Sequence, residues 1–214
     1  MIIQRYAENA LRIVFGSRID MEVHERVRRA FFLLISMHRN DIIEIIPSFC
    51  SCLVIYEGNR TSYDTLADLL KASLADLSDV EMPPPQVHVI PVRYGGDYGP
   101  DLSFVAKHCQ LTDAEVIERH CAEIYTVFTV GFTPGFPYMG TLDESIAAPR
   151  LETPRTRIPA GSVGIAQRQT GIYPFESPAG WRIIGRTEVR LFDPALPPYS
   201  LMQIGDKVRF TEEV

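Results

Sequence analysis

Three consecutive prolines, Pro83-Pro84-Pro85, divide this sequence more sharply than any other feature. Proline fixes φ and has no backbone N–H, so such a run neither continues a helix nor pairs inside a sheet. It instead forms an extended, stiff connector. With 214 residues, the chain is long enough for two small domains. We therefore expect a boundary at this point, with domains at residues 1–84 and 85–214.

The first domain alternates strand and helix patterns. Alternating apolar residues predict a strand at 11–15 and a hairpin formed by 42–47 and 52–57. Apolar residues at three- and four-residue spacing predict one helix that ends near residues 37–40 and a second with Leu66, Leu69, Leu70 and Leu74 on its inner face. The candidate N-caps of these helices are Asp20, Thr61 and Ser62.

The order of these elements is strand, helix, strand, strand, helix. This is the beginning of a ferredoxin-like split βαβ unit, which needs one further strand. Residues 87–92, VHVIPV, have a strand pattern and either complete this sheet or open the second domain. The periodicity of the apolar residues does not distinguish between these two placements of the strand.

The second domain has a different sequence pattern. Short helices are expected after Pro100-Asp101 and from Thr112, where Glu115 has the spacing of a capping box. Short β-type runs follow from Tyr125, separated by turns, and ten of the sixteen prolines lie between residues 134 and 198. This pattern predicts a compact β-barrel with long ordered loops. The runs are YTVFTVG, SVGIA, WRIIG, VRLF and KVRF.

Composition excludes several functions. The chain carries 27 acidic and 21 basic residues, which argues against a general nucleic-acid binder. It has no apolar run near the roughly 18 residues of a membrane span, and its N-terminal segment lacks the pattern of a secretory signal. We therefore expect a soluble, cytoplasmic protein with reduced cysteines. No histidine stands at a zinc-type spacing from a cysteine pair, so no metal site is predicted.

The motifs of common catalytic machinery are missing from the sequence. No lysine has the setting of a P-loop, and no G-x-G-x-x-G is present. Ser162 misses the G-x-S-x-G pattern because Ala160 replaces its first glycine. All five histidines precede residue 121 and are interpreted as surface or packed side chains, with His120 nearest to the Gly/Pro-rich segment. No catalytic residue is therefore assigned.

A cluster of arginines suggests an anion-binding face. Between residues 150 and 190, seven arginines stand against three glutamates. The planar fork of arginine suits a carboxylate or a phosphate. Arg155 and Arg157 share one face if the chain is extended, and Gln169 and Thr170 add neutral hydrogen-bonding groups. The alternative is a set of surface arginines that pair with nearby acids. The seven are Arg150, Arg155, Arg157, Arg168, Arg182, Arg186 and Arg190.

Two segments rich in Gly, Pro and aromatic residues suggest a preformed pocket wall. In GFTPGFPYMG, residues 131–140, prolines restrict φ while glycines permit unusual turns, so Phe136 and Tyr138 are predicted to form an apolar wall. The segment TGIYPFESPAGW, residues 170–181, adds Tyr173 as a polar pocket candidate. The alternative is that these aromatic side chains plug the end of a barrel. Residues expected to shape an intervening turn are Pro159, Gly161 and Ser162.

These blocks resemble the signature of the KipI family, whose members are also labelled allophanate hydrolase subunit 1 or the B subunit of 5-oxoprolinase. The blocks are IPVRYGGDYGPDL, GFTPGFPYMG, PRLETPRTRIPAGSVGIA and QTGIYPFESPAGWRIIGRT. The resemblance covers nearly the whole chain and is strongest over residues 90–192. Departures from the pattern are Thr133, Gln167-Arg168 and Ala179, of which only Gln167-Arg168 bears on ligand choice.

The resemblance implies an α+β protein with a small α/β domain followed by a cyclophilin-like β-barrel. It also implies partners, namely a KipA-type chain (the C subunit of 5-oxoprolinase) and the A subunit of the same enzyme. Their complex couples ATP hydrolysis to the opening of 5-oxoproline, which gives glutamate. ATP is therefore the expected cofactor of the complex, with no assigned site in this chain.

Other branches of the family imply other functions. One is a KipI-like inhibitor of a sensor histidine kinase, and another is a carboxyltransferase-type subunit of urea or allophanate metabolism. A cyclophilin-type prolyl isomerase is disfavoured, because a fold alone does not transfer an activity. Since the chain lacks a P-loop and well-placed histidines, we expect a non-autonomous enzyme subunit.

Overall fold

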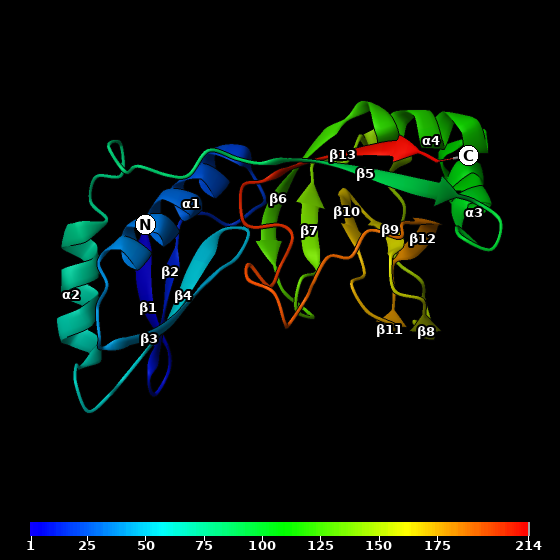
Figure 1. Cartoon of the computed structure of the whole chain (residues 1–214). Coiled ribbons are helices and arrows are strands. Elements are labelled where there is room, and N and C mark those ends of the chain that lie inside the picture. The colour runs from blue at the N-terminus through cyan, green and yellow to red at the C-terminus, as the bar shows by residue number, and fades with distance from the viewer. Residues whose placement is uncertain (214) are drawn as a thin grey trace. The chain divides into compact units, whose positions relative to one another are not determined.

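The computed structural model describes residues 1–213 and forms two compact units, unit 1 (Met1–Pro84) and unit 2 (Pro85–Val214). The division between them falls within the triple proline. Each unit has its own sheet system and its own helices (Figure 1). Each unit therefore has to be understood from its own core.

Unit 1 is a four-stranded antiparallel sheet with the strand order β1-β2-β4-β3, and its two helices contact the strands. Its core comes from the inward faces of the central strands and helices, including Leu11, Ile13, Val54, Leu34 and Leu70. The elements are β1 (Ile2–Ala7), β2 (Ala10–Val14), α1 (Met21–Ser36), β3 (Ile42–Pro47), β4 (Ser51–Tyr56) and α2 (Tyr63–Ser73).

Side-chain caps fix the starts of both helices. The Asp20 carboxylate accepts hydrogen bonds from the backbone N–H groups of Glu22 and Val23, at 2.9 and 3.2 Å. The Ser62 hydroxyl accepts from the backbone N–H of Thr65 at 3.2 Å. Each cap satisfies donors that a helix start leaves without intrahelical partners, so α1 and α2 begin where the sequence places a cap.

The fourth strand of this sheet comes from the N-terminal segment, and the sequence analysis did not predict it. β1 pairs antiparallel with β2, from Ile2 opposite Val14 to Ala7 opposite Ala10. Residues 87–92 lie instead in a strand of unit 2. The order from β2 to α2 is the expected one, but within residues 1–213 no strand follows α2 in this sheet. A complete ferredoxin-like unit is therefore not confirmed.

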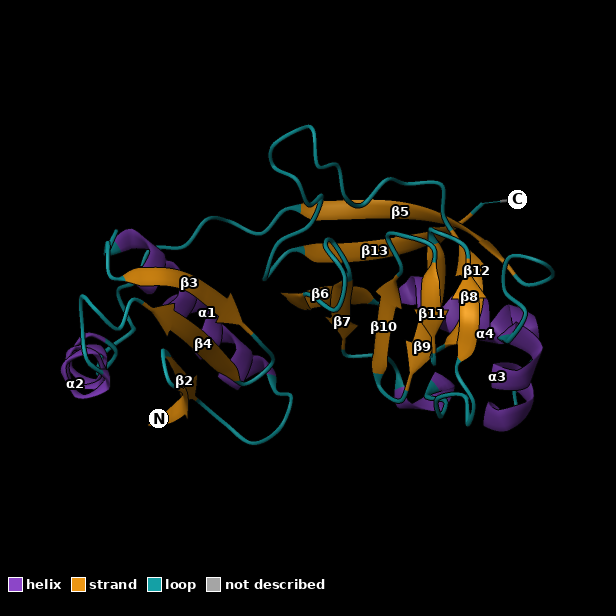
Figure 2. Ribbon diagram, turned by 90° about the horizontal axis from the view of Figure 1, so that it is seen from below, coloured by secondary structure: helices purple, strands orange, loops and turns teal. Residues whose placement is uncertain are grey.

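Unit 2 is built around a closed seven-stranded barrel with the order β10-β7-β6-β13-β5-β12-β9 (Figure 2). One neighbouring pair, β13 and β5, is parallel, and the other pairs are antiparallel. The barrel strands are β5 (Val87–Tyr94), β6 (Ile124–Val130), β7 (Pro137–Gly140), β9 (Ser162–Ala166), β10 (Gln169–Ile172), β12 (Arg182–Arg186) and β13 (Lys207–Glu212).

Further elements border the barrel. The helices α3 (Leu102–Cys109) and α4 (Asp113–Ala122) precede β6, and Thr112 and Glu115 form the predicted capping box of α4. A short helical turn, η1, spans Glu144–Ile146, and β8 (Arg155–Ile158) pairs with β11 (Ser177–Ala179) as a separate two-stranded sheet. The run VRLF, residues 189–192, does not form a strand, since only Phe192 makes an isolated bridge, to Ser200.

Unit 2 buries two hydrophobic clusters. The larger one fills the barrel and its helical cover, and includes Val127, Met139, Ile165 and Phe210. The smaller one gathers side chains from the β8–β11 sheet and neighbouring strands and loops, namely Phe136, Ile158, Ala166, Tyr173, Ala179, Trp181 and Ile183. Three aromatic residues of the Gly/Pro-rich segments, Phe136, Tyr173 and Trp181, therefore pack in this second cluster and not in the one that fills the barrel.

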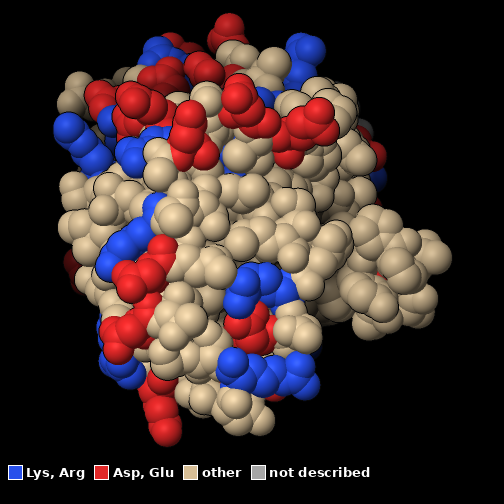
Figure 3. All heavy atoms as spheres, turned by 90° about the vertical axis from the view of Figure 1, so that its left-hand side faces the viewer, with Lys and Arg blue, Asp and Glu red and all other residues tan. Residues whose placement is uncertain are grey.

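Surface charge is mixed on the side of the molecule that carries α2. Figure 3 shows both basic and acidic groups on this side, with areas of uncharged surface around them. Among the residues described, no helix has the length and apolar character needed to cross a membrane. The same residues contain no group of three or more His, Cys, Asp or Glu side chains arranged to hold a metal ion.

Candidate functional site

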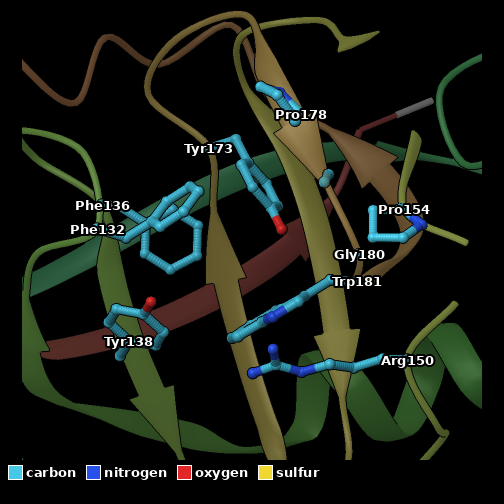
Figure 4. A pocket seen from close by; sticks show the side chains of 10 residues that line it. Phe132, Phe136, Tyr138, Arg150, Pro154, Tyr173, Pro178, Gly180 and Trp181 are labelled. Carbon is cyan, nitrogen blue, oxygen red and sulfur yellow. The ribbon is translucent and has the colours of Figure 1, made fainter. Parts of the chain in front are cut away.

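Unit 2 contains a cavity of about 260 Å³ with mainly aromatic walls (Figure 4). One wall comes from the loop between β6 and β7 and from β7 itself. The opposite wall comes from the segments around β8 and β11. Because these segments are far apart in sequence, the cavity exists only in the folded unit. Its lining residues are Phe132, Phe136, Tyr138, Arg150, Pro154, Tyr173, Pro178, Ala179, Gly180 and Trp181.

The rings hold one another in edge-to-face contacts around Phe136. Its ring centroid lies 4.7 Å from that of Tyr138, 4.9 Å from Tyr173 and 5.6 Å from Trp181. Such contacts add to the stability gained from burial alone. Gly171 lets the rings approach the strand, since a Cβ there would lie 2.8 Å from Cζ of Phe136 and 3.1 Å from Cζ3 of Trp181. The aromatic wall is therefore preformed.

The loop that presents Phe136 is tightly closed. The backbone N–H of Gly131 donates to the Phe136 carbonyl oxygen at 3.0 Å, and the N–H of Phe136 donates to the Thr133 carbonyl oxygen at 3.1 Å. Gly135 adopts a φ of +82°, which glycine accepts without steric cost. Phe132, in the same loop, is 65% exposed and lies at the mouth of the cavity. This agrees with the predicted rigid but irregular segment.

Arg150 is the charged side chain of the cavity. Its guanidinium carbon lies 5.8 Å from the ring centroid of Trp181, and the side chain extends toward the cavity below that ring (Figure 4). Within residues 1–213, the other six arginines of the predicted cluster all form ion pairs, whereas Arg150 forms none. Its charge therefore remains available to a ligand. The six pairs are Arg155–Asp101, Arg157–Glu176, Arg168–Glu144, Arg182–Asp101, Arg186–Glu188 and Arg190–Asp193.

Two tyrosine hydroxyls add neutral polar groups. Burial raises the pKa of Tyr173 to about 12. Burial also raises the pKa of Tyr138, against a smaller opposing effect of the Arg150 charge. Both phenols are therefore protonated at neutral pH and each carries an O–H that can donate. The cavity combines flat apolar walls with one cation and two hydroxyl groups.

The structure brings together three of the predicted site residues, Phe136, Tyr138 and Tyr173, at this cavity. It places the two predicted anion ligands elsewhere. Arg155 makes a two-bond contact with the buried Asp101, at 2.7 and 2.9 Å. Arg157 pairs with Glu176 at 2.7 Å on the exposed surface. An anion-binding face shared by Arg155 and Arg157 is therefore corrected to two separate ion pairs.

Gln169 and Thr170 do not line the cavity either. Thr170 is fully buried, and its hydroxyl is engaged with His120 and with the Gly164 carbonyl oxygen. Gln169 is half-buried, and its amide nitrogen has no hydrogen-bond partner among the residues described. Both residues belong to the barrel strand β10 (Gln169–Ile172), none of whose residues lines the cavity.

The turn at Pro159, Gly161 and Ser162 supports the cavity from behind. The Ser162 hydroxyl donates to the Pro159 carbonyl oxygen at 2.7 Å, and the Gly161 N–H donates to the Tyr173 carbonyl oxygen at 2.7 Å. Gly161 adopts a φ of +79°, and a Cβ there would collide with the Thr187 carbonyl oxygen. These residues therefore shape a turn, as expected, and none of the three lines the cavity.

Sequence reasoning did not assign Arg150, Phe132 or Trp181 to the site. Trp181 is 4% exposed and also forms part of the cavity wall. Phe132 shares its loop with Phe136, so the argument for that loop extends to it. No local sequence pattern distinguished Arg150 from the other arginines, because the availability of its charge to a ligand depends on which acidic residues the other arginines pair with.

Unit 2 thus combines a closed barrel with a preformed aromatic cavity. The ten lining residues include no His, Cys, Ser, Asp or Glu, so the cavity has no nucleophile–base pair. It has instead the shape and chemistry of a small ligand site. The class is thus a two-unit protein with a closed barrel and a candidate site for a small ligand.

Comparison with known proteins places the chain in a family. The family described as carboxyltransferase domain, subdomain C and D, matches residues 1–202, and the chain belongs to it. The chain is 38% identical to the 5-oxoprolinase B subunit of Bacillus subtilis over 218 residues, which covers 97% of this chain and 91% of that protein.

Solved structures share its fold. TTHA0988 matches with a TM-score of 0.85 and 31% identity over 100% of this chain, which spans 40% of the length of that chain. The urea carboxylase of Kluyveromyces lactis matches with a TM-score of 0.80 and 18% identity, over 99% of this chain and 22% of that one. The second similarity concerns the fold alone.

Proposed function

We propose that this chain is the B subunit of an ATP-dependent 5-oxoprolinase that converts 5-oxoproline to glutamate. One observation carries the proposal, namely the 38% identity to the Bacillus subtilis relative, which covers 97% of this chain and 91% of that protein. The similarity therefore spans both units of the chain. A cytoplasmic location and a cyclophilin-like character of the barrel belong to the same proposal.

The geometry supports a subunit that depends on partners. A lactam is a stable amide, and its opening requires activation of the carbonyl oxygen, for which ATP-dependent phosphorylation is a suitable reaction. The cavity offers Arg150 and two phenolic hydroxyls but no carboxylate, imidazole or thiol among its lining residues. The activating groups then come from other chains, in this proposal the KipA-type chain and the A-type chain of the enzyme. ATP binds in the assembled complex.

Two other functions are weighed by specific observations. The family description, carboxyltransferase domain, favours a carboxyltransferase-type role in urea or allophanate metabolism, whereas the similarity to the urea carboxylase, at 18% identity, concerns the fold alone. The 65% exposure of Phe132 favours a KipI-like role, in which the aromatic loop docks on a histidine kinase. Inhibition of kinase autophosphorylation by the purified chain, without 5-oxoproline-dependent ATP hydrolysis, supports that second role.

The experiment is a reconstitution from separately purified subunits. The chain is combined with its A-type and C-type partners, singly and together, and ATP hydrolysis and glutamate formation are measured with and without 5-oxoproline. We expect coupled turnover only with the complete set. Turnover by this chain alone contradicts dependence on partners, and no 5-oxoproline-dependent turnover by the complete set contradicts the proposed function.

A further inference from the structure

We propose that the aromatic cavity of unit 2 binds a small ring-shaped carboxylate, and that Arg150 forms the ion pair with the carboxylate group. The choice of 5-oxoproline as that ligand rests on the proposed function. The cavity, its size and its single available cation do not rest on it.

The size and walls of the cavity favour a small ring. A volume of about 260 Å³ lies below the roughly 300–1,000 Å³ of drug-sized ligand sites. The walls are ring faces and edges from Phe132, Tyr173 and Trp181, with Pro154 and Pro178 on the side away from Phe132 (Figure 4). Since these side chains are rigid and already in contact with one another, the cavity accepts a compact, flat molecule better than a long flexible chain.

The charge of the cavity favours a monoanion. Arg150 is the only ionisable cation among its lining residues, and it forms no ion pair within residues 1–213. Its planar fork donates two parallel hydrogen bonds to a carboxylate. A multiply charged phosphate would need more than this one cation, and a cationic ligand would be repelled by it. A carboxylate therefore fits the charge of the site.

The remaining polar groups suit the amide of a lactam. The hydroxyls of Tyr138 and Tyr173 are protonated at neutral pH, because burial raises the pKa of both. A protonated phenol can donate to a carbonyl oxygen and can also accept from an amide N–H. The cavity thus contains a partner for the carboxylate and partners for the ring amide of a cyclic amino-acid derivative.

Trp181 provides a direct reporter, because it is the only tryptophan in the chain and forms part of the cavity wall. The full-length chain is titrated with 5-oxoproline while the tryptophan fluorescence is recorded. Parallel titrations use 2-pyrrolidinone, which lacks the carboxylate, and cyclopentanecarboxylate, which lacks the lactam. We expect saturable binding of 5-oxoproline, weaker binding of cyclopentanecarboxylate and the weakest binding of 2-pyrrolidinone.

Variants test the role of Arg150. Arg150→Gln is expected to weaken 5-oxoproline binding by about 10- to 100-fold, the range set by loss of a hydrogen-bonded charge pair. Arg150→Lys should restore part of the affinity, because it keeps the charge without the planar fork. The matched control is Arg209→Gln, which removes an exposed arginine of β13 outside the cavity and should leave binding unchanged. Circular dichroism and thermal unfolding show whether each variant is folded.

The experiments distinguish an error in the assignment of this site from an error in the proposed function. In the reconstituted complex, Arg150→Gln should raise the KM for 5-oxoproline by a similar factor. If the wild-type complex is active but Arg150→Gln changes neither its KM nor the binding to the isolated chain, the site assignment is overturned and the proposed function stands. If the isolated chain binds cyclic carboxylates through Arg150 but the complex does not hydrolyse 5-oxoproline, the site stands and the proposed function fails.

Discussion

At the scale of single residues, both ring nitrogens of His120 are held by hydrogen bonds in the interior of unit 2. It is fully buried, with Nε2 2.9 Å from the Thr170 hydroxyl and Nδ1 2.8 Å from the Tyr94 hydroxyl. Because Thr170 donates to the Gly164 carbonyl oxygen at 3.1 Å, its oxygen accepts from Nε2–H, and Nδ1 accepts from Tyr94. The ring also stacks on Phe210 at 4.5 Å. These partners fix a neutral imidazole with its proton on Nε2.

The neutral state of His120 predicts a pH dependence of stability. Burial lowers the pKa of His120 in the folded protein to about 3. The unfolded chain, with an ordinary histidine pKa near 6.5, therefore binds more protons between these values. The free energy of unfolding should fall as pH falls through this window, by about 2 kcal/mol from this group between pH 7 and pH 5.

Urea unfolding at the two pH values measures the effect. His120→Gln should lose this part of the pH dependence, whereas His108→Gln, at an exposed position of α3, should keep it. If His120→Gln does not fold, NMR titration of wild-type His120 gives the answer. Protonation of His120 in the folded protein near pH 6 would contradict the assignment.

The sequence could predict the cluster of arginines, but it could not predict that Arg150 is the member available to a ligand. The pairs that occupy Arg155 and Arg168 join residues 54 and 24 positions apart, Asp101 and Glu144 respectively. Such pairings depend on tertiary structure, and no local pattern shows them. The aromatic residues were more predictable, because a loop rich in Gly and Pro holds Phe136 and Tyr138 wherever the rest of the chain lies.

At the scale of elements, one ion pair connects the β8–β11 sheet to the rest of unit 2. Asp101, just before α3, accepts two hydrogen bonds from Arg155 on β8 and a third from the backbone N–H of Ile183 on β12, at 2.7 Å. Pro154 directly precedes β8 and Pro178 lies within β11, and both line the cavity. Asp101 therefore positions one wall of the cavity relative to the barrel.

A double-mutant cycle tests this connection. Arg155→Gln should lower the free energy of unfolding by about 1–3 kcal/mol, less than the loss of a fully buried pair, because the Arg155 side chain is 33% exposed. Asp101→Asn should lower it as well, and the two changes should couple by more than about 0.5 kcal/mol. Arg157→Gln is the matched control, since its exposed pair should contribute at most about 1 kcal/mol. If the effects of Arg155→Gln and Asp101→Asn on the free energy of unfolding are additive, the Arg155–Asp101 ion pair does not hold this wall of the cavity in place.

Elements with strong local signals were predicted and short ones were not. The helices α1 and α2 follow from apolar spacing and side-chain caps, and α4 follows from its capping box, whereas Asp101 before α3 makes no side-chain cap hydrogen bond. Short strands such as β7, β8 and β11 contain Pro or begin beside it, and their pairing is set by partners distant in the sequence. The VRLF run has strand composition but lies outside the closed barrel, so composition alone was misleading there.

At the scale of the whole molecule, the two units have separate cores and are joined through an exposed segment. Glu81 and residues 83–87 are exposed and, apart from the start of β5, lie outside regular structure. We therefore predict that a glutamate-specific protease cuts the native chain first after Glu81, because folded elements protect most other sites. Mass spectrometry should find two resistant fragments that meet at Glu81–Met82. Early cleavage inside either unit would contradict independent cores.

Closure of the barrel limits how a partner chain attaches. Each barrel strand has hydrogen-bonded neighbours on both sides, so none of the seven offers a free edge along its paired length. Outer edges in the part of the chain described here belong to β1 and β3 in unit 1 and to the two-stranded β8–β11 sheet. A partner that docks by adding a strand must therefore extend one of these small sheets, and one that meets the barrel must recognise it through side chains and loops.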